Sequence, residues 1–324
     1  MEIVALEPGV VYTCWNDSSV KMAAGTEDGS ILIYEPDKGS RSLYSRSSKW
    51  KAHQGVVLKL VWAPSEYGDV LACCSTDGVI SVWEEVEERE KPLEWRLCRQ
   101  FTGNGVPVLD VQFGSCATGL KLVAAGGDGY LRVYEASNVL ELDNWQLQAE
   151  FSNVTDVQQK LEKIVCSAAS ISWRPAANAI QQPLFVTGFR TNSRQHGIVK
   201  VWEFGEMHQR WHLVAELISP DFEYGLINHV AWASNIGRPY ELIAIASSTS
   251  LSIWSVQSSA TSGGSPSVKL LGSFTEHEGE VWQVEWDMAG MTLASTGADG
   301  VVRFWQSNYK GTWEQKGILE GSAN

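Results

Sequence analysis

The stretch Leu71-Ala-Cys-Cys-Ser-Thr-Asp-Gly-Val-Ile-Ser-Val-Trp83 contains two apolar runs separated by an Asp-Gly pair. A tight hairpin turn needs positive φ angles, which aspartate tolerates and glycine adopts freely. The stretch therefore predicts two antiparallel strands that are joined by a tight turn and closed by a tryptophan.

The same pattern recurs along the chain at intervals of about fifty residues. Asp-Gly pairs also stand at 28–29, 128–129 and 299–300. The β-rich runs close on Tyr34, Trp83, Tyr134, Trp202, Trp254 and Trp305. A second aromatic precedes each hairpin, at Trp15, Trp62, Phe113, Trp173, Trp232 and Trp286. One further strand on each side of the hairpin gives four strands per repeat, which is typical of WD-type propeller blades.

We therefore predict an all-β fold, a six-bladed WD-repeat β-propeller in a single domain over residues 1–321, with a short tail at 322–324. The expected blades cover approximately residues 10–50, 51–102, 103–151, 165–218, 226–275 and 276–321. Three insertions are expected at the surface. Residues 152–170 lengthen the link between the third and fourth repeats, with a short helix expected at 157–164, and residues 189–198 form a polar hairpin. Residues 257–268 are low in complexity and are expected to be a disordered loop.

Two repeats carry polar residues at the spacing of the internal hydrogen-bond relay of WD repeats. Such a relay ties the turn, the preceding loop and the blade together when every polar member is satisfied. The expected relay residues are His277, Ser295, Asp299 and Trp305 in the last repeat, and His53, Asp77 and Trp83 in the second. Cys73 replaces the serine in the second repeat, so its relay is expected to be weaker. The first, fourth and fifth repeats are degenerate.

The spacing leaves open whether the ring closes on itself. The last repeat supplies its own four strands, at 280–286, 291–298, 301–306 and 313–319, so it needs no N-terminal strand to complete it. Six complete blades can pack as a closed ring. Alternatively, the ring stays open between the first and sixth blades, and a partner covers the exposed blade faces by adding strands.

Composition and motifs argue against catalysis, cofactors and nucleic-acid binding. The net charge of −13, from 25 Lys and Arg against 38 Asp and Glu, disfavours contact with a phosphate backbone. No apolar run approaches the ~20 residues of a membrane helix, and the first residues lack the features of a secretory signal.

Six cysteines without a CxxC pair are expected to be reduced thiols. His208 and His212 are read as exposed strand histidines, because residues i and i+4 of a strand lie ~13 Å apart. The acidic run 84–90 is either a solvated loop or a contact for a basic partner.

Several segments go beyond a generic WD pattern. They are 52–64, 67–72, 128–136, 144–148, 281–286, 299–309 and, most specific because no WD consensus dictates them, 237–246 (Gly-Arg-Pro-Tyr-Glu-Leu-Ile-Ala-Ile-Ala) and 306–321. Over residues 10–321 the chain resembles the SEH-type WD-repeat scaffold nucleoporins, relatives of the SEC-thirteen coat protein.

The resemblance implies an open propeller that is completed in trans by a blade from an α-solenoid scaffold nucleoporin. It implies membership of the Y-shaped subcomplex of the nuclear pore complex at the nuclear envelope of the nucleus, with roles in mRNA export and protein transport. It also implies a second role in a complex that regulates the TOR nutrient pathway at the surface of the vacuole or lysosome, with some of the protein then in the cytoplasm. Neither direct nucleic-acid binding nor membrane insertion is implied.

The partner-blade interface is expected near the ring opening, on the first and sixth repeats. The candidate residues are Val4, Leu6, Val10, Val11, Tyr12, Val281, Trp282 and Val284. Core packing is the alternative role for each of them. The alternative function is a closed WD-repeat adaptor that reads peptides at its channel mouth, in a ubiquitin-ligase or chromatin complex.

Overall fold

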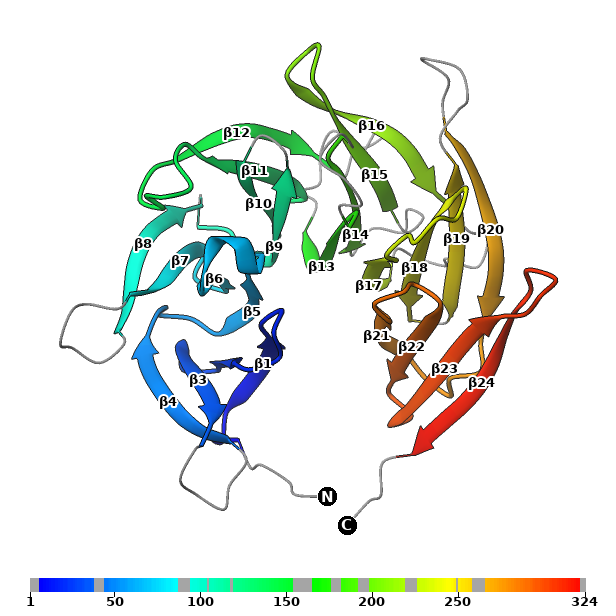
Figure 1. Cartoon of the computed structure of the whole chain (residues 1–324), viewed down its shortest axis with the longest axis horizontal. Coiled ribbons are helices and arrows are strands. Elements are labelled where there is room, and N and C mark those ends of the chain that lie inside the picture. The colour runs from blue at the N-terminus through cyan, green and yellow to red at the C-terminus, as the bar shows by residue number, and fades with distance from the viewer. Residues whose placement is uncertain are drawn as a thin grey trace. The chain divides into compact units, whose positions relative to one another are not determined.

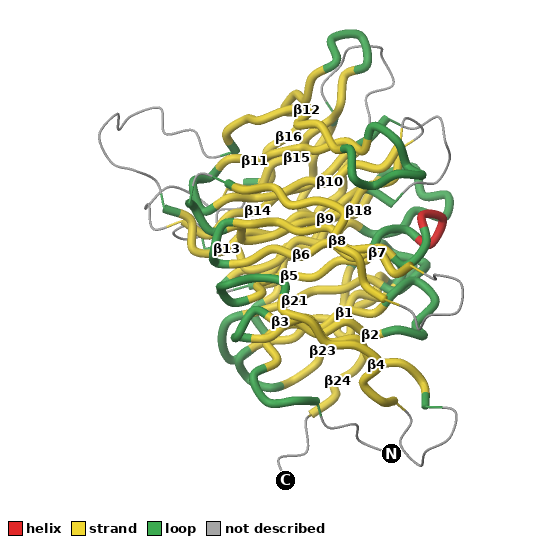
Figure 2. Tube along the Cα trace, turned by 90° about the vertical axis from the view of Figure 1, so that its left-hand side faces the viewer, coloured by secondary structure: helices red, strands yellow, loops and turns green. Residues whose placement is uncertain are grey.

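The structure, a computed structural model, describes most of the chain. The described residues are 6–37, 44–86, 94–103, 105–116, 119–153, 165–175, 182–191, 198–218, 226–248, 250–257 and 266–320. Most of them are in strands (Figure 2), and the one helical element among them is a single 3-10 turn at Ser65–Tyr67. In this part of the chain no helix has the length and hydropathy of a membrane span. Val4, the tail at 322–324 and most of the three predicted insertions lie outside the described residues.

The first compact unit, Met1–Gly127 with Leu131–Glu150, contains three four-stranded sheets. The first sheet has β1 (Val10–Trp15), β2 (Met22–Thr26), β3 (Ser30–Pro36) and β4 (Tyr44–Lys51). The second has β5 (Val57–Trp62), β6 (Val70–Ser75), β7 (Val79–Val86) and β8 (Glu94–Thr102). The third has β9 (Val108–Cys116), β10 (Gly119–Gly126), β11 (Tyr130–Ala136) and β12 (Trp145–Ser152).

The second compact unit, Asp128–Tyr130 with Phe151–Asn324, contains the other three sheets. The fourth sheet has β13 (Cys166–Trp173), β14 (Leu184–Thr191), β15 (Ile198–Gly205) and β16 (Arg210–Leu217). The fifth has β17 (Ile227–Trp232), β18 (Glu241–Ser247), β19 (Leu251–Gln257) and β20 (Ser267–Phe274). The sixth has β21 (Val281–Trp286), β22 (Thr292–Gly297), β23 (Val301–Ser307) and β24 (Trp313–Glu320).

The prediction of six four-stranded antiparallel blades is confirmed. Within each sheet the strands lie side by side in chain order, so every described sheet is complete in itself (Figure 1). This self-contained topology agrees with an open propeller, in which the chain's N-terminus does not close the last blade. The grouping of all six blades into one domain stays a prediction, because the internal contacts divide the chain into two compact units.

The four Asp-Gly pairs form the predicted turns. Their glycines have φ angles of 85°, 78°, 77° and 70° at Gly29, Gly78, Gly129 and Gly300. In each turn the aspartate carboxylate accepts the N–H two residues later, at Ser30, Val79, Tyr130 and Val301, over 2.9–3.2 Å. The carboxylates therefore hold backbone turns, as expected, and do not form a catalytic set.

The inner sheets are buried on both faces because neighbouring sheets pack against them. Every residue of β2 and of β6 is buried. In the first unit, Ile31 of the first sheet and Leu60 and Leu71 of the second belong to one apolar cluster. Strands covered on both faces are apolar at nearly every position rather than at alternate positions. This explains runs such as the one at 71–74, with which the sequence argument began.

Candidate partner-binding face

The sixth sheet differs from the inner sheets because only one of its faces is fully covered. On the covered face Val281, Val284 and Trp305 are 0–1% exposed. They share an apolar cluster with Ala244 and Leu251 of the fifth sheet, so this face forms the core between those two sheets.

The opposite face is built by cross-strand neighbours, because residues directly opposite each other in a sheet point to the same side. Phe304 pairs with Ala294 on one side and Gly317 on the other. Val302 pairs with Thr296 and with Leu319. The half-exposed face consists of Gln283, Glu285, Ala294, Thr296, Val302, Phe304, Gly317 and Leu319, all of which are half-buried or exposed.

The fifth sheet, the neighbour of the sixth in the second unit, does not share this exposure. Strand β18 is buried at every residue after Glu241, whereas β22 alternates between half-buried and buried residues. In β23 the four residues before Trp305 are all half-buried. The sixth sheet therefore offers an apolar surface, centred on Val302 and Phe304, that a partner can cover.

The structure places the candidate interface residues of the sixth repeat in two different environments. Val281 and Val284 lie in the core against the fifth sheet, which is the alternative role given for them, and they are not accessible to a partner. These two residues, three apart in the sequence, share a face because of the register shift between Val281 and Gln283, and the sequence showed neither the shift nor the covered face. Trp282, which lies beside a register shift in β21, is 55% exposed and remains accessible.

The predicted contacts of the first repeat divide in a similar way. Leu6 is 36% exposed and Val11 46% exposed. Val10 packs against a small cluster that includes Leu32 and Tyr34. Tyr12 lies against the core between the first and second sheets and has the ammonium of Lys59 above its ring, 4.8 Å from the centroid. Leu6 and Val11 are therefore the accessible members of this group.

In the sixth sheet a hydrogen-bond relay joins His277, Asp299, Ser295 and Trp305. His277 Nδ1 lies 3.0 Å from both carboxylate oxygens of Asp299, and its Nε2 lies 2.8 Å from Ser295 Oγ. The indole N–H of Trp305 donates to the same Ser295 oxygen over 2.9 Å. Arg303 forms an additional ion pair with Asp299 at 3.1 Å. The relay fixes the loop before β21 and the turn after β22, and so holds the sheet that carries the half-exposed face.

This geometry predicts a pH dependence of stability. Burial alone would raise the pKa of the Asp299 carboxyl, but hydrogen bonds from His277, the Val301 N–H and Arg303 lower it to about 2. The folded-state pKa is thus below the unfolded value, so the stabilisation is present above that value and is lost as pH falls through about 2. The difference in urea unfolding midpoint between wild type and Asp299→Asn should shrink between about pH 5 and pH 2.5. A difference that stays constant over this range would contradict the assignment.

The second sheet keeps a relay, but through a residue that sequence reasoning missed. His53 Nε2 lies 2.9 Å from Ser81 Oγ, and the Trp83 indole N–H donates to that oxygen over 2.9 Å. Cys73 Sγ lies 3.1 Å from the same histidine nitrogen. His53 Nδ1 is 3.3 Å from Asp77 but is not aligned for a hydrogen bond. A hydroxyl two residues before the closing tryptophan thus replaces the serine expected on the second strand.

The fourth and fifth sheets also use polar residues that the spacing did not reveal. In the fourth, Asn153 Oδ1 accepts both the Thr187 hydroxyl and the Trp202 indole N–H over 2.8 Å. In the fifth, the Trp254 indole donates to Ser252 over 3.0 Å. The fourth repeat is therefore not degenerate, because asparagine takes the place of histidine. In the second and fifth repeats, a serine two residues before the closing tryptophan is the sequence pattern that could have predicted the acceptor of the indole N–H.

Two arginines join neighbouring sheets of the second unit. Arg190 at the end of β14 donates to Asn228 of β17 over 3.0 Å and pairs with Glu280 at 3.3 Å, while the Asn228 amide donates to the Val281 carbonyl. This arrangement, the Arg190 clasp, links the fourth, fifth and sixth sheets. It positions the start of β21 at the edge of the sixth sheet.

The second arginine lies in the segment that carried the strongest resemblance. Arg238, in the β17–β18 loop, donates to the carbonyls of Ser234 and of Gly290 in the β21–β22 turn. A Cβ on Gly290 would lie 2.1 Å from the Ser234 oxygen, so this turn needs a glycine. The segment at 237–246 therefore locks the fifth sheet to the sixth.

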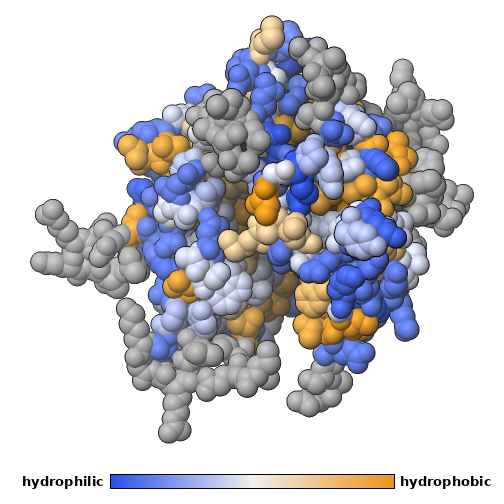
Figure 3. All heavy atoms as spheres, turned by 45° about the vertical axis from the view of Figure 1, so that its right-hand side comes forward, coloured by the Kyte–Doolittle hydropathy of each residue, from blue (hydrophilic) through white to orange (hydrophobic). Residues whose placement is uncertain are grey.

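The surface on the side of β20 and β24 is mixed in character. Figure 3, turned so that this side comes forward, shows apolar patches set among polar side chains. Ile318 and Leu319, near the C-terminal end of β24, are 47% and 58% exposed. Apolar patches with polar surroundings are typical of protein interfaces.

Comparison with known proteins identifies the family. The sequence profile of the WD domain, G-beta repeat family matches residues 44–84 and 268–306. Protein SEH1 of Arabidopsis thaliana is 46% identical over 318 residues, covering 98% of both chains. Nucleoporin SEH1 of Bos taurus and of Homo sapiens are each 31% identical over 315 residues, covering 94% of this chain and 83% of the relative. The chain belongs to the SEH1 family of WD-repeat nucleoporins.

Membership of the SEH1 family makes the chain a scaffold subunit of the nuclear pore complex at the nuclear envelope and not an enzyme. Of the two histidines expected to be exposed strand residues, His212 lies exposed on β16, but His208 lies in the turn between β15 and β16, so the expectation of a strand is wrong for His208. His212 pairs with the Glu203 carboxylate across β15 and β16, at 3.2 Å. Among the described residues, no group of three or more His, Cys, Asp and Glu could hold a metal ion.

Proposed function

We propose that this SEH1-family chain binds an α-solenoid scaffold nucleoporin that adds a blade to the half-exposed face of the sixth sheet. In this role it is a building block of the Y-shaped subcomplex, which supports mRNA export and protein transport. The observation that carries the proposal is the contrast between β18, buried after its first residue, and β23, half-buried before Trp305.

The physical basis of the proposed contact is burial of apolar surface together with strand addition. Full burial of a Val or Phe side chain contributes ~1.5–3 kcal/mol, and half-buried side chains retain part of that gain for a partner. Val302, Phe304 and Leu319 form the apolar centre, and Gln283 and Glu285 add polar groups at the β21 side. Trp282, Leu6 and Val11 are proposed as further contacts, because their side chains remain accessible.

We further propose the second role in a complex that regulates the TOR pathway at the vacuolar or lysosomal surface. It rests on the resemblance of segments 237–246 and 306–321 alone. Affinity purification from vacuole- or lysosome-enriched membranes tests it. Recovery of TOR-regulating subunits is the expected result, and their absence from a preparation that yields nucleoporins in parallel would contradict it.

Replacing Phe304 with glutamate should weaken binding of the α-solenoid nucleoporin by ~10- to 100-fold. The reason is that a charge placed on the half-exposed face must be desolvated, while the burial of one aromatic side chain, worth ~1.5–3 kcal/mol, is lost. The measurement is calorimetric titration of the purified chain with the partner from the same organism. Tyr309→Glu is the matched control, because Tyr309 is an aromatic residue of the same sheet's outer turn and is 93% exposed.

A second variant keeps the test valid if Phe304→Glu fails to fold. Leu319→Glu lies on the same face but is 58% exposed, so it should fold normally and still weaken binding. If both single variants, Leu319→Glu and Phe304→Glu, fold and bind the partner with full affinity, the proposal is overturned. Purification from nuclear extract that recovered a ubiquitin-ligase or chromatin complex and no nucleoporins would equally overturn it and favour the adaptor.

A further inference from the structure

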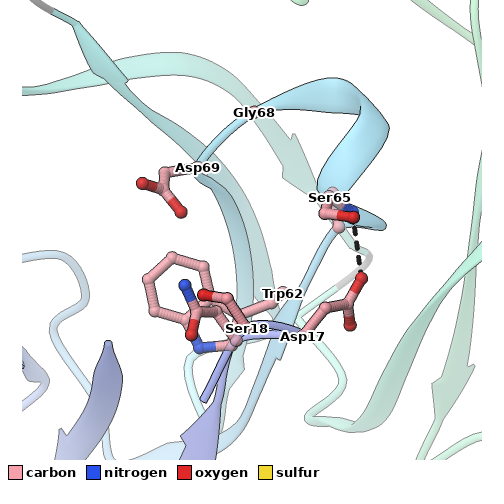
Figure 4. Close-up of a pocket in the computed structure, with 8 residues that line it drawn as sticks. Asp17, Ser18, Trp62, Ser65, Gly68 and Asp69 are labelled. Carbon is pink, nitrogen blue, oxygen red and sulfur yellow. Dashed lines mark hydrogen bonds between the residues drawn. The ribbon is translucent and has the colours of Figure 1, made fainter. Parts of the chain in front are cut away.

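The two faces of the first sheet have different neighbours. Ala23, Ile31 and Ile33 on one face share an apolar cluster with the second sheet. The same side is fixed further in the turn after β1, because the Asp17 carboxylate accepts the Ser65 N–H of the β5–β6 loop over 2.9 Å (Figure 4). The second sheet therefore covers one face of the first sheet and leaves the opposite face, the outer face, for other contacts.

The outer face of the first sheet is nonetheless buried at its centre. Cross-strand pairs place Met22 beside Tyr34 and Ala24 beside Leu32, so these four side chains share the outer face. They are 0–9% exposed. The half-exposed face of the sixth sheet lacks such burial in β23. The first sheet is therefore covered on both faces, unlike the sixth.

The segment Leu6–Gly9, which comes before β1, is bonded to the outer face through Glu7. The Glu7 N–H donates to the Tyr34 hydroxyl over 3.3 Å. The Glu7 carboxylate forms ion pairs with Arg46 and Lys49, the latter at 2.8 Å. Both cations lie opposite residues of the outer face, across β3 and β4. We call Leu6–Gly9 the strap, because it joins the chain before β1 to three residues of this face.

The bonds that hold the strap are open to water. The side chains of Glu7, Arg46 and Lys49 are 31–46% exposed. Ion pairs at such positions contribute little to stability, because water screens the charges and the long side chains lose freedom. Leu6 is itself 36% exposed, so it adds only partial apolar burial. Opening of the strap therefore costs little.

The chain turns between the strap and β1 at Pro8-Gly9. Gly9 has a φ of 84°, a conformation that glycine adopts far more readily than other residues. The Gly9 carbonyl accepts the Glu27 N–H over 2.8 Å, which fixes the start of β1. Rotation at Pro8-Gly9 can thus release Leu6 and Glu7 and leave the hydrogen bonds of the sheet in place.

We propose that the outer face of the first sheet is a docking surface for an acidic segment of the partner, and that the strap occupies this surface in the free chain. Glu7 shows the chemistry that the surface selects, a carboxylate between two cations and a backbone N–H on the Tyr34 hydroxyl. A partner segment with a glutamate among apolar residues can make the same contacts, and complementary charge selects it over neutral segments.

The displacement of the strap rests on the proposed function, in which the partner first docks on the sixth sheet. A segment tethered by a short linker acts at a ~millimolar local concentration, so the strap outcompetes a free acidic peptide. A partner that is already docked gains a similar advantage and can displace the strap. Leu6 stays within reach of this partner while the strap is closed. The strap thus reserves the first sheet for a partner that is held at a second surface.

The test opens the strap with Glu7→Lys, which places a third positive charge beside Arg46 and Lys49. The probe is a fluorescein-labelled peptide with the sequence of residues 1–9, titrated with the full chain and followed by fluorescence anisotropy. It should bind the variant at least tenfold more tightly than wild type, whose own strap competes. A peptide with glutamine at its seventh position should bind the variant at least threefold more weakly than the glutamate peptide.

Glu27→Lys is the matched control, because it makes the same charge change on the same sheet. The Glu27 side chain is exposed, and its bond to Gly9 uses the backbone N–H, so this variant should bind the peptide as wild type does, within twofold. Gly9→Ala opens the strap through backbone strain and keeps the test valid if Glu7→Lys fails to fold. Equal peptide binding by wild type and the opened variants, equal tightening by Glu27→Lys, or equal affinity for the two peptides would each overturn the proposal.

Titration with the α-solenoid nucleoporin separates the docking surface from the proposed function. Gly9→Ala changes no charge and should bind the nucleoporin about three- to tenfold more tightly than wild type, because the strap no longer competes. Unchanged affinity would overturn displacement of the strap by this partner. If the nucleoporin binds neither chain, the proposed function fails, while the peptide titration still decides whether the outer face is a docking surface.

Discussion

Replacement of Gly29 with alanine is expected to lower the free energy of unfolding by about 3 kcal/mol or more. Gly29 has a φ of 85°, and an L-residue in that region costs ~1–2 kcal/mol by itself. A Cβ at this position would also lie 2.3 Å from the His53 carbonyl oxygen and 2.6 Å from that of Gly55. The backbone that enters the second sheet would therefore have to move. That movement would disturb the hydrogen bonds that the Ala52 and His53 N–H groups donate to the Gly29 carbonyl.

Gly300 provides a matched control for this substitution. It occupies the equivalent Asp-Gly turn of the sixth sheet with a φ of 70°, but a Cβ there meets nothing within 4 Å. Gly300→Ala should cost only the ~1–2 kcal/mol of the backbone conformation. Urea unfolding of both variants gives the comparison, and equal losses would show that the close approach at Gly29 is not a structural constraint.

Replacement of Trp305 with alanine should cost ~3–5 kcal/mol, the usual range for removing a large aromatic from a core. The Trp305 side chain is fully buried, packs against Phe274 with ring centroids 4.6 Å apart, and donates to Ser295. The substitution leaves a cavity between the fifth and sixth sheets and removes one bond of the relay. Unfolding monitored by circular dichroism measures the loss.

Trp282 is the control for Trp305, because both tryptophans belong to the sixth sheet and differ in burial. Trp282 is 55% exposed, so Trp282→Ala should change the free energy of unfolding by less than about 1 kcal/mol. The same variant should weaken binding of the partner that is proposed to cover this sheet. Similar destabilisation by both substitutions would mean that Trp305 does not anchor the core in the way described.

Much of the fold followed from the sequence because its signals are local. The Asp-Gly turns are set by backbone conformation within four residues, and the closing aromatics repeat at the spacing of one blade. For the last repeat, the predicted strands at 301–306 and 313–319 match β23 and β24 to within one residue. Local signals of this kind survive whatever surrounds them, since the turn and the strand pairing need no distant residue.

The half-exposed face of the sixth sheet and the full membership of the relays depend on contacts between residues that are distant in the sequence. Val281 and Val284 share one face of the sixth sheet because of the register shift between Val281 and Gln283, and the fifth sheet covers that face. Ser81 and Asn153 enter their relays because their oxygen atoms reach the tryptophan indoles in space. A scan for histidine and serine at fixed spacing overlooks them, because any well-placed oxygen can accept the same bond.

Every described sheet is made of four strands that follow one another in the sequence. During synthesis on the ribosome, each blade can therefore complete its hydrogen bonds as soon as its own fourth strand has emerged, without waiting for the far end of the chain. Domains and their parts generally fold in this N-to-C order as they are made. Within each compact unit, the growing protein thus exposes one face of its newest blade until the following blade packs against that face. In the proposed assembly the last covering step is made by a second polypeptide, so completion of the subunit depends on the supply of its partner.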